Sequence, residues 1–323
     1  MYNVLLTGRK FMNVLSLFDG ISCGRIALDR LGVKPTHYFA SEIDKNAIKC
    51  SKANWDDITH IGDVTKVRYE NGVLYTESGE YEVKIDLVLA GSPCQGFSFA
   101  GKQLAFSDPR SSLYFEFERI LCEIKQHNPS AKFLLENVKM KKESENVITE
   151  RLGVNPTPIN SKLVSAQNRP RYYWTNIPHT VPEDKGIMLK DILEDVGVSD
   201  KVLHFKPSVR GLVVEQYEDI KSSKSVIHQL KFEGRSGYQD KQIGITKSPC
   251  VTTTGFTLVL DASNNVRICT VTDLERLQTV PDGYTSMLPK TRACHALGNG
   301  WTVAVIEHIL SHLFSDKESS SSP

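Results

Sequence analysis

The 323-residue sequence lacks several features that would point to a particular class of protein. Its seven cysteines form no C-x-x-C pair, so neither a zinc site of that kind nor a thioredoxin-like redox pair is indicated. It has no recognisable signal peptide and no long apolar run, and this favours a reducing compartment inside the cell. We therefore expect a cytoplasmic protein that has no membrane partner.

The sequence also has no excess of charge of either sign, because 39 Lys and Arg oppose 38 Asp and Glu for a net charge of +1. This balance neither favours nor excludes a nucleic-acid partner. If DNA is bound, the positive charge must be gathered in one cleft. The hydrophobic fraction of 40% and the charged fraction of 24% are typical of a globular protein, and the length allows one large domain or two unequal ones.

The first 138 residues alternate between strand and helix patterns, which predicts a parallel, doubly wound α/β sheet covered on both faces. In such sheets ligands bind at the carboxyl ends of the strands. The predicted strands lie at residues 11–18, 37–44, 59–64, 84–90 and 131–138, and the predicted helices at residues 24–32, 44–54 and 111–126.

The alternation stops after residue 178. Residues 179–270 contain only short apolar runs between polar stretches such as KPSVRG and GRSGYQDKQ, and they predict a smaller, loop-rich region. Helical patterns return at residues 270–278 and in the last segment, GNGWTVAVIEHILSHLF, where Trp301, Val305, Ile309 and Leu313 form one stripe.

The segment after the first strand resembles a dinucleotide-binding turn, but it has Gly20-x-x-x-Gly24 instead of G-x-G-x-x-G. Glu42 ends the second strand 22 residues after Gly20, where a carboxylate suits a ribose diol. Asp63 ends the third strand and could accept from an adenine amino group. These features fit NAD, FAD or S-adenosylmethionine, and an ordinary strand-to-helix turn is the alternative.

Two details of this turn favour S-adenosylmethionine. The missing glycine removes the tight cradle that a pyrophosphate needs. Asp19 adds a negative charge that repels phosphates and tolerates a sulfonium and an amino group, and Phe18 is placed to lie against the adenine face.

A reactive loop follows the fourth strand, in the stretch GSPCQGFSFAG at residues 91–101. A lone cysteine is more often a small buried hydrophobic residue than a nucleophile. Cys94, however, follows the helix-breaking Pro93 at the ligand end of the sheet, where exposed backbone N–H groups would favour its thiolate. Glu136 ends the next strand, and Arg169 and Arg171 lie two apart in an extended segment, on one side of it. Taken singly, the carboxylate and the arginines could be ordinary surface groups.

The order of these motifs resembles the DNA cytosine-5 methyltransferases. It is FDGxxxG, PCQGFS, ENV, QNRPRYY and GNGWTV, and the resemblance covers roughly residues 12–180 and 265–314. SLFDGI and VSAQNRPRYYW are similar to the animal de novo enzymes, whereas PCQGFS and DLERLQTVPDGY are similar to bacterial and phage modification enzymes.

The resemblance implies a Rossmann-like class I methyltransferase domain, formed by residues 1–178 plus 271–323, and a smaller target-recognition domain at residues 179–270. It implies S-adenosyl-L-methionine as methyl donor, S-adenosyl-L-homocysteine as product and no metal. The implied partner is double-stranded DNA with the target cytosine rotated out of the stack. We expect a monomer on DNA with no obligate protein partner.

The resemblance also assigns roles to individual residues. Cys94 is the nucleophile, Glu136 acts at N3 of the base and Arg171 at O2, with Arg169 bracing Glu136 or a backbone phosphate. Gln95 and Ser98 match positions near the flipped nucleotide. Gly300 stands where many relatives carry a hydroxyl residue. The implied cofactor positions are Phe18, Asp19, Gly20, Ile21, Ser22, Glu42, Ile43, Asp63, Val64, Pro93, Leu113, Asn299 and Trp301.

Recognition of the DNA target sequence is expected to come from residues 179–270. For each candidate residue there, a position in a solvated loop with no role in recognition is the alternative. Side chains there that could contact base edges are Arg235, Gln239, Lys241, Gln242, Thr252, Thr253 and Thr254.

Three other functions fit parts of the pattern. A tRNA cytosine methyltransferase would usually carry a Cys-Phe-Thr signature after the catalytic domain, and none is present. A non-catalytic relative would have lost Cys94, Glu136 or Arg171, and all three are present. An NAD-type oxidoreductase is disfavoured by the missing glycine and leaves PCQGFS without a role.

Overall fold

The structure is a computed structural model that describes residues 12–92, 112–196, 225–234, 237–255, 257–261 and 266–314. The chain divides into two compact units. The first consists of residues 1–159, 171–181 and 305–323, and the second of residues 160–170 and 182–304. Residues 93–101 of the reactive loop, which include Cys94, lie outside the described residues.

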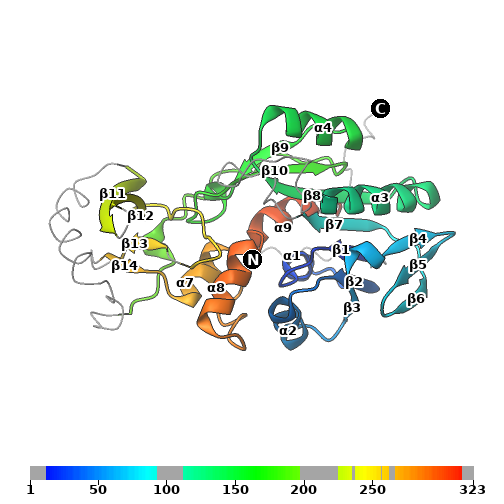
Figure 1. The fold of residues 1–323 in the computed structure, drawn as a ribbon, viewed down its shortest axis with the longest axis horizontal. Coiled ribbons are helices and arrows are strands. Elements are labelled where there is room, and N and C mark those ends of the chain that lie inside the picture. Colours follow the sequence, from blue (N-terminus) through cyan, green and yellow to red (C-terminus); the bar gives the residue numbers. More distant parts are fainter. Residues whose placement is uncertain are drawn as a thin grey trace, which may run out of the picture. The chain divides into compact units, whose positions relative to one another are not determined.

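The described part of the first unit is built on a seven-stranded sheet in the order β3-β2-β1-β7-β8-β10-β9 (Figure 1). Strands β3, β2, β1, β7 and β8 are parallel, which confirms the predicted α/β class, and β10 pairs antiparallel with β8. Residues 87–90 of β7 are buried throughout, as expected for a parallel strand covered on both faces. The strands are β1 (Asn13–Leu17), β2 (His37–Ser41), β3 (Ile58–Gly62), β7 (Leu87–Gly91), β8 (Lys132–Val138), β9 (Thr157–Asn160) and β10 (Pro170–Thr175).

The helices of this unit agree with the local sequence signals. Asp44 caps α2 by accepting from the backbone N–H groups of Asn46 and Ala47, and α4 ends at Gly153, whose φ of +68° favours glycine. The predicted last helix is present as α9, and Arg30 of α1 pairs with Glu307 of α9 at 3.6 Å. The helices are α1 (Cys23–Arg30), α2 (Lys45–Asn54), the 3₁₀ helix η1 (Val64–Lys66), α3 (Ser112–His127), α4 (Lys142–Leu152) and α9 (Val303–Ser311).

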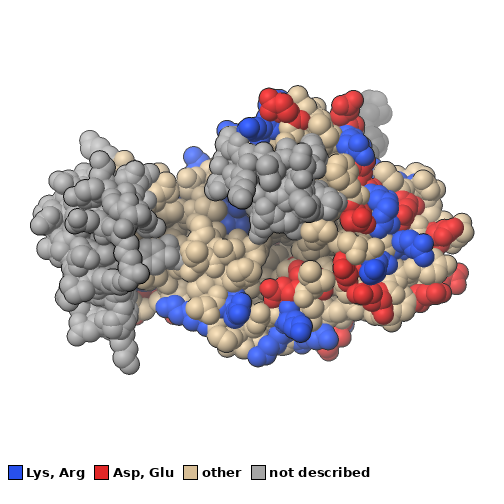
Figure 2. All heavy atoms as spheres, in the orientation of Figure 1, with Lys and Arg blue, Asp and Glu red and all other residues tan. Residues whose placement is uncertain are grey.

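A small antiparallel sheet that the strand–helix alternation did not predict is inserted between β3 and β7. It consists of β4 (Arg68–Glu70), β5 (Val73–Thr76) and β6 (Gly79–Glu82). The first turn uses Asn71 and Gly72, both with positive φ, the pattern that a tight hairpin turn requires. Figure 2 shows acidic and basic side chains interspersed over the surface of α3 and this sheet, so the balanced charge of the sequence is also a local property here.

The second unit contains a four-stranded sheet in the order β11-β12-β13-β14 and helices α7 and α8 (Figure 1). Thr270 and Asp273 form a capping box at the start of α7, which confirms the helix expected there. The elements are the 3₁₀ helices η4 (Ser161–Leu163) and η5 (Leu189–Asp191), strands β11 (Ile227–Gly234), β12 (Gly237–Gly244), β13 (Leu258–Leu260) and β14 (Val266–Ile268), and helices α7 (Val271–Leu277) and α8 (Lys290–Asn299).

Helix α8 packs closely on the turn formed by Thr252–Gly255. A Cβ atom on Gly298 would lie 2.4 Å from the backbone at Thr252 and Thr253, and one on Gly255 would lie 2.4 Å from Sγ of Cys294. Both contacts are too short for any side chain, so glycine is required at each position.

The two compact units divide the chain at other residues than the predicted domains do, because residues 160–170 and 271–304 belong to the second unit. The division into catalytic and target-recognition domains stays a prediction.

Candidate active site

Glu136 lies at the carboxyl end of β8 in the first unit, beside the strand that leads into the reactive loop. The parallel register pairs Gly91 of β7 with Glu136, and Cys94 follows Gly91 by three residues. One residue further along both strands, Nδ2 of Asn137 donates to Oγ of Ser92 at 3.1 Å. The ladder and this side-chain bond therefore fix the point from which the reactive loop starts.

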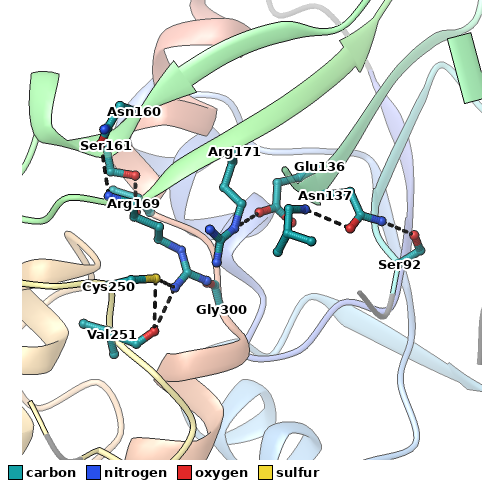
Figure 3. A network of polar contacts seen from close by, with 12 residues as sticks. Ser92, Glu136, Asn137, Asn160, Ser161, Arg169, Arg171, Cys250, Val251 and Gly300 are labelled. Atoms are coloured by element: carbon teal, nitrogen blue, oxygen red, sulfur yellow. Dashed lines mark hydrogen bonds and ion pairs between the residues drawn. The ribbon is translucent and has the colours of Figure 1, made fainter. Parts of the chain in front are cut away.

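Arg171 supplies the cation that faces Glu136. It lies on β10, where the antiparallel register places it opposite Val138 and places Tyr173 opposite Glu136. The guanidinium reaches the carboxylate diagonally, and its Nε lies 2.9 Å from Oε1 of Glu136 (Figure 3). Both side chains are mostly buried, at 14% and 11% exposed, so the pair is screened little by solvent.

Three carboxylates lie where β1, β2 and β3 end, as predicted. Glu42 is held by the backbone: its Oε2 accepts from the N–H of Gly20 and its Oε1 from those of Ile43 and Asp44, all at 2.8 Å. Gly20 has a φ of +59°, and nothing lies within 4 Å of the position that a Cβ would take there. The glycine turn thus has open space above it with a fixed carboxylate beside it, and these residues fit the ribose of an adenosyl group.

The Asp19 carboxylate points into the protein. It is 8% exposed and accepts from the hydroxyls of Ser22 at 2.5 Å and Tyr38 at 2.8 Å. Burial raises the pKa of Asp19 to about 6, against the effect of the hydrogen bonds from Ser22 and Tyr38. The carboxylate therefore organises the turn from below, and the predicted charge complement to a sulfonium is not seen in these contacts.

Asp63 follows β3 and caps η1 by accepting from the N–H of Thr65. Its own backbone N–H donates to Oε2 of Glu77 at 2.8 Å. Glu77 comes from the turn between β5 and β6, so the inserted sheet contributes to the adenine end of the predicted cofactor site. Sequence reasoning missed Glu77, because nothing in the local pattern connects that turn with β3.

The other predicted cofactor residues of the first unit divide between core and surface. Phe18 and Leu113 are partly buried and pack against the hydrophobic core of this unit. The side chains of Ile21, Ser22 and Val64 are buried, so only their backbone could contact a ligand, whereas Ile43 is 70% exposed. Pro93, Cys94, Gln95 and Ser98 lie outside the described residues.

Arg169 lies in the second unit and is 3% exposed. Its Nη1 donates to the carbonyl of Val251 and to Sγ of Cys250, and its Nη2 donates to the carbonyls of Gly298 and Gly300 (Figure 3). The expected brace to Glu136 is not among these bonds, and the alternative contact with a backbone phosphate stays a prediction. The guanidinium is instead used inside the second unit, where it ties the segment at residue 250 to the end of α8.

The remaining predicted residues also lie in the second unit. Asn299 is the exposed last residue of α8, and Trp301 is 8% exposed. Thr252, Thr253 and Thr254 are exposed on one turn, where Oγ1 of Thr252 lies 2.9 Å from Oγ1 of Thr254. Strand β12 carries Gln239, Lys241 and the exposed Gln242, and the structure leaves the side chains of Gln239 and Lys241 undescribed. Arg235 lies outside the described residues.

Gln167 and Gln278 were missed by sequence reasoning, and both are fully buried. Gln167 accepts from the N–H of Val251 and donates to the carbonyl of Leu277 and to Oε1 of Gln278. Gln278 in turn donates to the carbonyls of Leu297 and Gly300. The alternation of Ser165, Gln167 and Arg169 along an extended segment was the available signal, because it places all three side chains on one face.

The described residues hold no group of three or more His, Cys, Asp or Glu side chains suited to a metal ion. The same residues include no helix with the length and apolar character needed to cross a membrane.

The parallel sheet, with a glycine turn and fixed carboxylates at its carboxyl edge, is a Rossmann-like α/β fold of the class that binds adenosine-containing ligands at that edge. Within that class, the model of the C-5 cytosine-specific DNA methylase family matches residues 12–315, and the chain belongs to this family. The family's chemistry is methylation of cytosine C5 in DNA, so DNA is the substrate and S-adenosyl-L-methionine the implied methyl donor.

Two relatives align along most of the chain. The type II methyltransferase M1.ScrFI of Lactococcus lactis subsp. cremoris is 30% identical over 95% of this chain and 79% of its own length. The type II methyltransferase M.HpaII of Haemophilus parainfluenzae is also 30% identical, over 93% of this chain and 88% of its own.

Two solved structures share the fold. The methyltransferase EhMeth of Entamoeba histolytica superposes with a TM-score of 0.67 at 17% identity and covers 96% of this chain and 100% of its own. A DNMT2 mutant of Spodoptera frugiperda superposes with a TM-score of 0.60 at 19% identity, over 94% of this chain and 100% of its own. At these identities the likeness concerns the fold.

Proposed function

We propose that the protein methylates C5 of a cytosine flipped out of double-stranded DNA, through a transient covalent bond between Cys94 and C6 of the base. The observation that carries this proposal is the register of β7 and β8. It sets Glu136, paired with Arg171, beside the residue from which the Cys94 loop departs. The proposed acid and cation thus lie at one edge of the sheet, and the loop that carries the proposed nucleophile departs from the same edge.

The turn around Gly20 supports an adenosyl cofactor, because it is open where a Cβ would lie and because Glu42 is already fixed beside it. Glu42 would accept hydrogen bonds from the ribose, Asp63 would accept from the adenine amino group, and Phe18 and Leu113 would flank the ring. When bound, S-adenosyl-L-methionine supplies an electrophilic methyl group on a sulfonium.

The residues of the chain would act on the base in sequence. The Cys94 thiolate forms a bond to C6, and the electrons of the C5–C6 double bond make C5 nucleophilic. Glu136 donates a proton or hydrogen bond to N3, and Arg171 donates to O2, so the charge that develops on the ring is stabilised. After C5 has gained the methyl group, its proton passes to a base such as water, and the electrons of the C5–H bond re-form the double bond and expel Cys94.

A base inside a duplex cannot present C6 to a thiolate, so the cytosine must leave the stack. Gln95 and Ser98, in the same loop as Cys94, would contact the flipped nucleotide and its phosphate. Target choice would come from residues 179–270, with Arg235, Gln239, Lys241, Gln242 and Thr252–Thr254 as candidates. The names of the type II relatives support a sequence-specific role in restriction–modification.

The function is tested by bisulfite sequencing of DNA from cells that express the protein, which reports activity and target together. We expect methylated cytosines at one short sequence with the wild type and none with Cys94→Ala, which should fold normally. Purified tRNA serves as the competing substrate. Transfer of a labelled methyl group to tRNA with none to duplex DNA would show that tRNA, and not DNA, is the substrate.

The covalent step has its own test, because fluorine cannot leave C5 as a proton does. Duplex DNA that carries 5-fluorocytosine at the target site should trap the wild type as a complex that resists denaturation, and Cys94→Ala should form none. An active wild type that is not trapped, or a Cys94→Ala variant that still methylates DNA, would refute the role of Cys94.

A further inference from the structure

The segment Ser165–Arg169 is a hub of buried hydrogen bonds in the second unit. Ser165, Gln167 and Arg169 are 1%, 0% and 3% exposed, so this short segment places three polar side chains in the interior of the unit. Oγ of Ser165 donates to the carbonyl of Leu277 at 2.6 Å. Buried polar groups are retained only where they are satisfied, and here each one finds a partner more than 80 residues away in the sequence.

Arg169 makes the most numerous of these bonds. The carbonyls of Gly298 and Gly300 lie 3.1 and 2.9 Å from its Nη2, and the carbonyl of Val251 lies 2.9 Å from its Nη1. The two glycine carbonyls belong to the end of α8, where helix carbonyls lack partners within the helix. A cation is favoured there by the helix dipole as well. The planar guanidinium can serve these acceptors together, which a lysine ammonium cannot do in the same geometry.

Gln278 holds the same helix end from a second direction. Its Nε2 donates to the carbonyls of Leu297 at 2.7 Å and Gly300 at 3.1 Å. Its Oε1 accepts from Gln167 and from Oγ1 of Thr302, both at 3.0 Å, so its amide orientation is fixed. The carbonyl of Gly300 therefore accepts from both Arg169 and Gln278.

Asn299 lies between the two carbonyls that Arg169 binds, and its side chain is exposed. We infer that Arg169 and Gln278 are positioning residues for Asn299, which they present to the cofactor by fixing the backbone on both sides of it. The inference rests on the proposed function and on the cofactor position that the resemblance to the cytosine-5 methyltransferases implies for Asn299. It assigns Arg169 to cofactor affinity and away from the chemistry at Glu136.

The inference is tested by calorimetric binding of S-adenosyl-L-homocysteine to the full-length protein, together with steady-state kinetics. Arg169→Met should raise the Kd for S-adenosyl-L-homocysteine and the KM for S-adenosyl-L-methionine about tenfold or more, the factor that corresponds to one lost charge-assisted hydrogen bond. The KM for DNA should not change, and kcat at saturating substrates should fall less than the affinity. Arg169→Lys should restore part of the affinity, and Gln278→Leu should show a smaller loss of the same kind.

A double-mutant cycle with Asn299→Ala separates positioning from general damage. If Arg169 acts through Asn299, adding Arg169→Met to Asn299→Ala should raise Kd little further. Arg276→Met is the matched control, because its guanidinium bonds go to Asp282 and the carbonyl of Ile192. Its Kd should equal that of the wild type.

Several outcomes overturn the inference. Wild-type Kd in Arg169→Met with a large fall in kcat would return Arg169 to the chemistry at the base. Full additivity with Asn299→Ala would also overturn it, as would equal losses in Arg169→Met and the Arg276→Met control. If Arg169→Met does not fold, Arg169→Lys and Gln278→Leu decide by the same criteria. A wild type that binds no S-adenosyl-L-homocysteine would instead overturn the proposed function and the inference with it.

Discussion

The two units use polar side chains in different ways. In the first unit, the polar groups that matter lie where strands end, and they bond to backbone that the sheet already fixes, as Glu42 does to Gly20. In the second unit, Gln167, Arg169 and Gln278 are buried and join segments far apart in the sequence. The described residues of the second unit form no sheet as large as that of the first. Hydrogen bonds of buried side chains hold its segments together instead.

The comparison teaches that a polar side chain at a strand end can be spared for chemistry, because the ladder supports the fold without it. A buried side chain that holds loops together cannot be spared, because its removal leaves carbonyls without partners. Polar substitutions in the first unit should therefore affect activity most, and those in the second unit should affect the free energy of unfolding most.

The largest effect is expected from Glu136→Gln. The amide keeps the shape but cannot donate a proton to N3, so kcat should fall about 10²- to 10⁴-fold. The amide oxygen can still accept from Nε of Arg171, so the free energy of unfolding should fall less than in a variant that removes a buried charge outright. The Kd for S-adenosyl-L-homocysteine should stay close to that of the wild type. Methyl transfer to duplex DNA and chemical denaturation are the two measurements. A marked loss of stability with retained activity would break the comparison.

The next effect is expected from Arg267→Met in the second unit. Arg267 pairs with Asp273, and the two side chains are 1% and 0% exposed. Removal of the cation leaves an unpaired buried carboxylate, which should lower the free energy of unfolding by about 3–5 kcal/mol. Urea denaturation measures this loss. Part of it should be recovered in Arg267→Met/Asp273→Asn, because the asparagine carries no charge and its amide oxygen can still accept a backbone hydrogen bond from Thr270 or Glu194. A single variant as stable as the wild type would contradict the comparison.

A third prediction concerns pH and the first unit. Burial raises the pKa of Asp19 from its ordinary value of 3.8 to about 6, so the folded protein holds a proton that the unfolded chain releases. The resulting stabilisation, roughly 3 kcal/mol at most, is fully present below pH 3.8 and is lost as pH rises through about 6. Asp19→Asn removes this dependence. The difference in unfolding free energy between wild type and variant should change between pH 4 and 7, and a constant difference would contradict the assignment.

The smallest effect is expected from Asp282→Asn. Asp282 is 52% exposed and pairs with Arg276 at 2.6 Å on the surface of the second unit. An exposed pair of this kind contributes about 1 kcal/mol or less. Thermal unfolding should therefore change little, and the small change should shrink further in high salt. A loss as large as that of Arg267→Met would show that exposure does not separate the two ion pairs.

Much of the fold could be predicted from sequence because its signals are local. Each of these elements is predicted by a pattern within about ten residues: an apolar run for β1, β2, β7 and β8, and an apolar stripe for α9. The sheet β4–β6 had a local signal too, in the Asn71–Gly72 turn between alternating residues. The strand–helix alternation does not predict this sheet, because β4–β6 interrupt that alternation between β3 and β7.

The candidate site could be predicted only in part, for a related reason. The positions of Glu42 and Glu136 at the ends of predicted strands predict their location, because the carboxyl ends of parallel strands lie at the same edge of the sheet. The partners of the Arg169 guanidinium lie 81 to 131 residues away along the chain, and no local pattern identifies them. The two-residue spacing of Arg169 and Arg171 predicted that both act near Glu136. The two residues belong to different units, because the chain passes from the second unit to the first between them.

If residues 179–270 choose the DNA target, as proposed, the close approach of Gly298 to the Thr252–Thr253 backbone limits how that target could be changed. A recognition segment grafted from a relative can replace residues up to Lys247 without meeting this contact. A graft that extends through Gly255 must also supply a backbone that packs directly on α8 at Gly298, where the helix has no side chain. Exchange of specificity between relatives is therefore easiest when the donor segment stops short of the threonine turn.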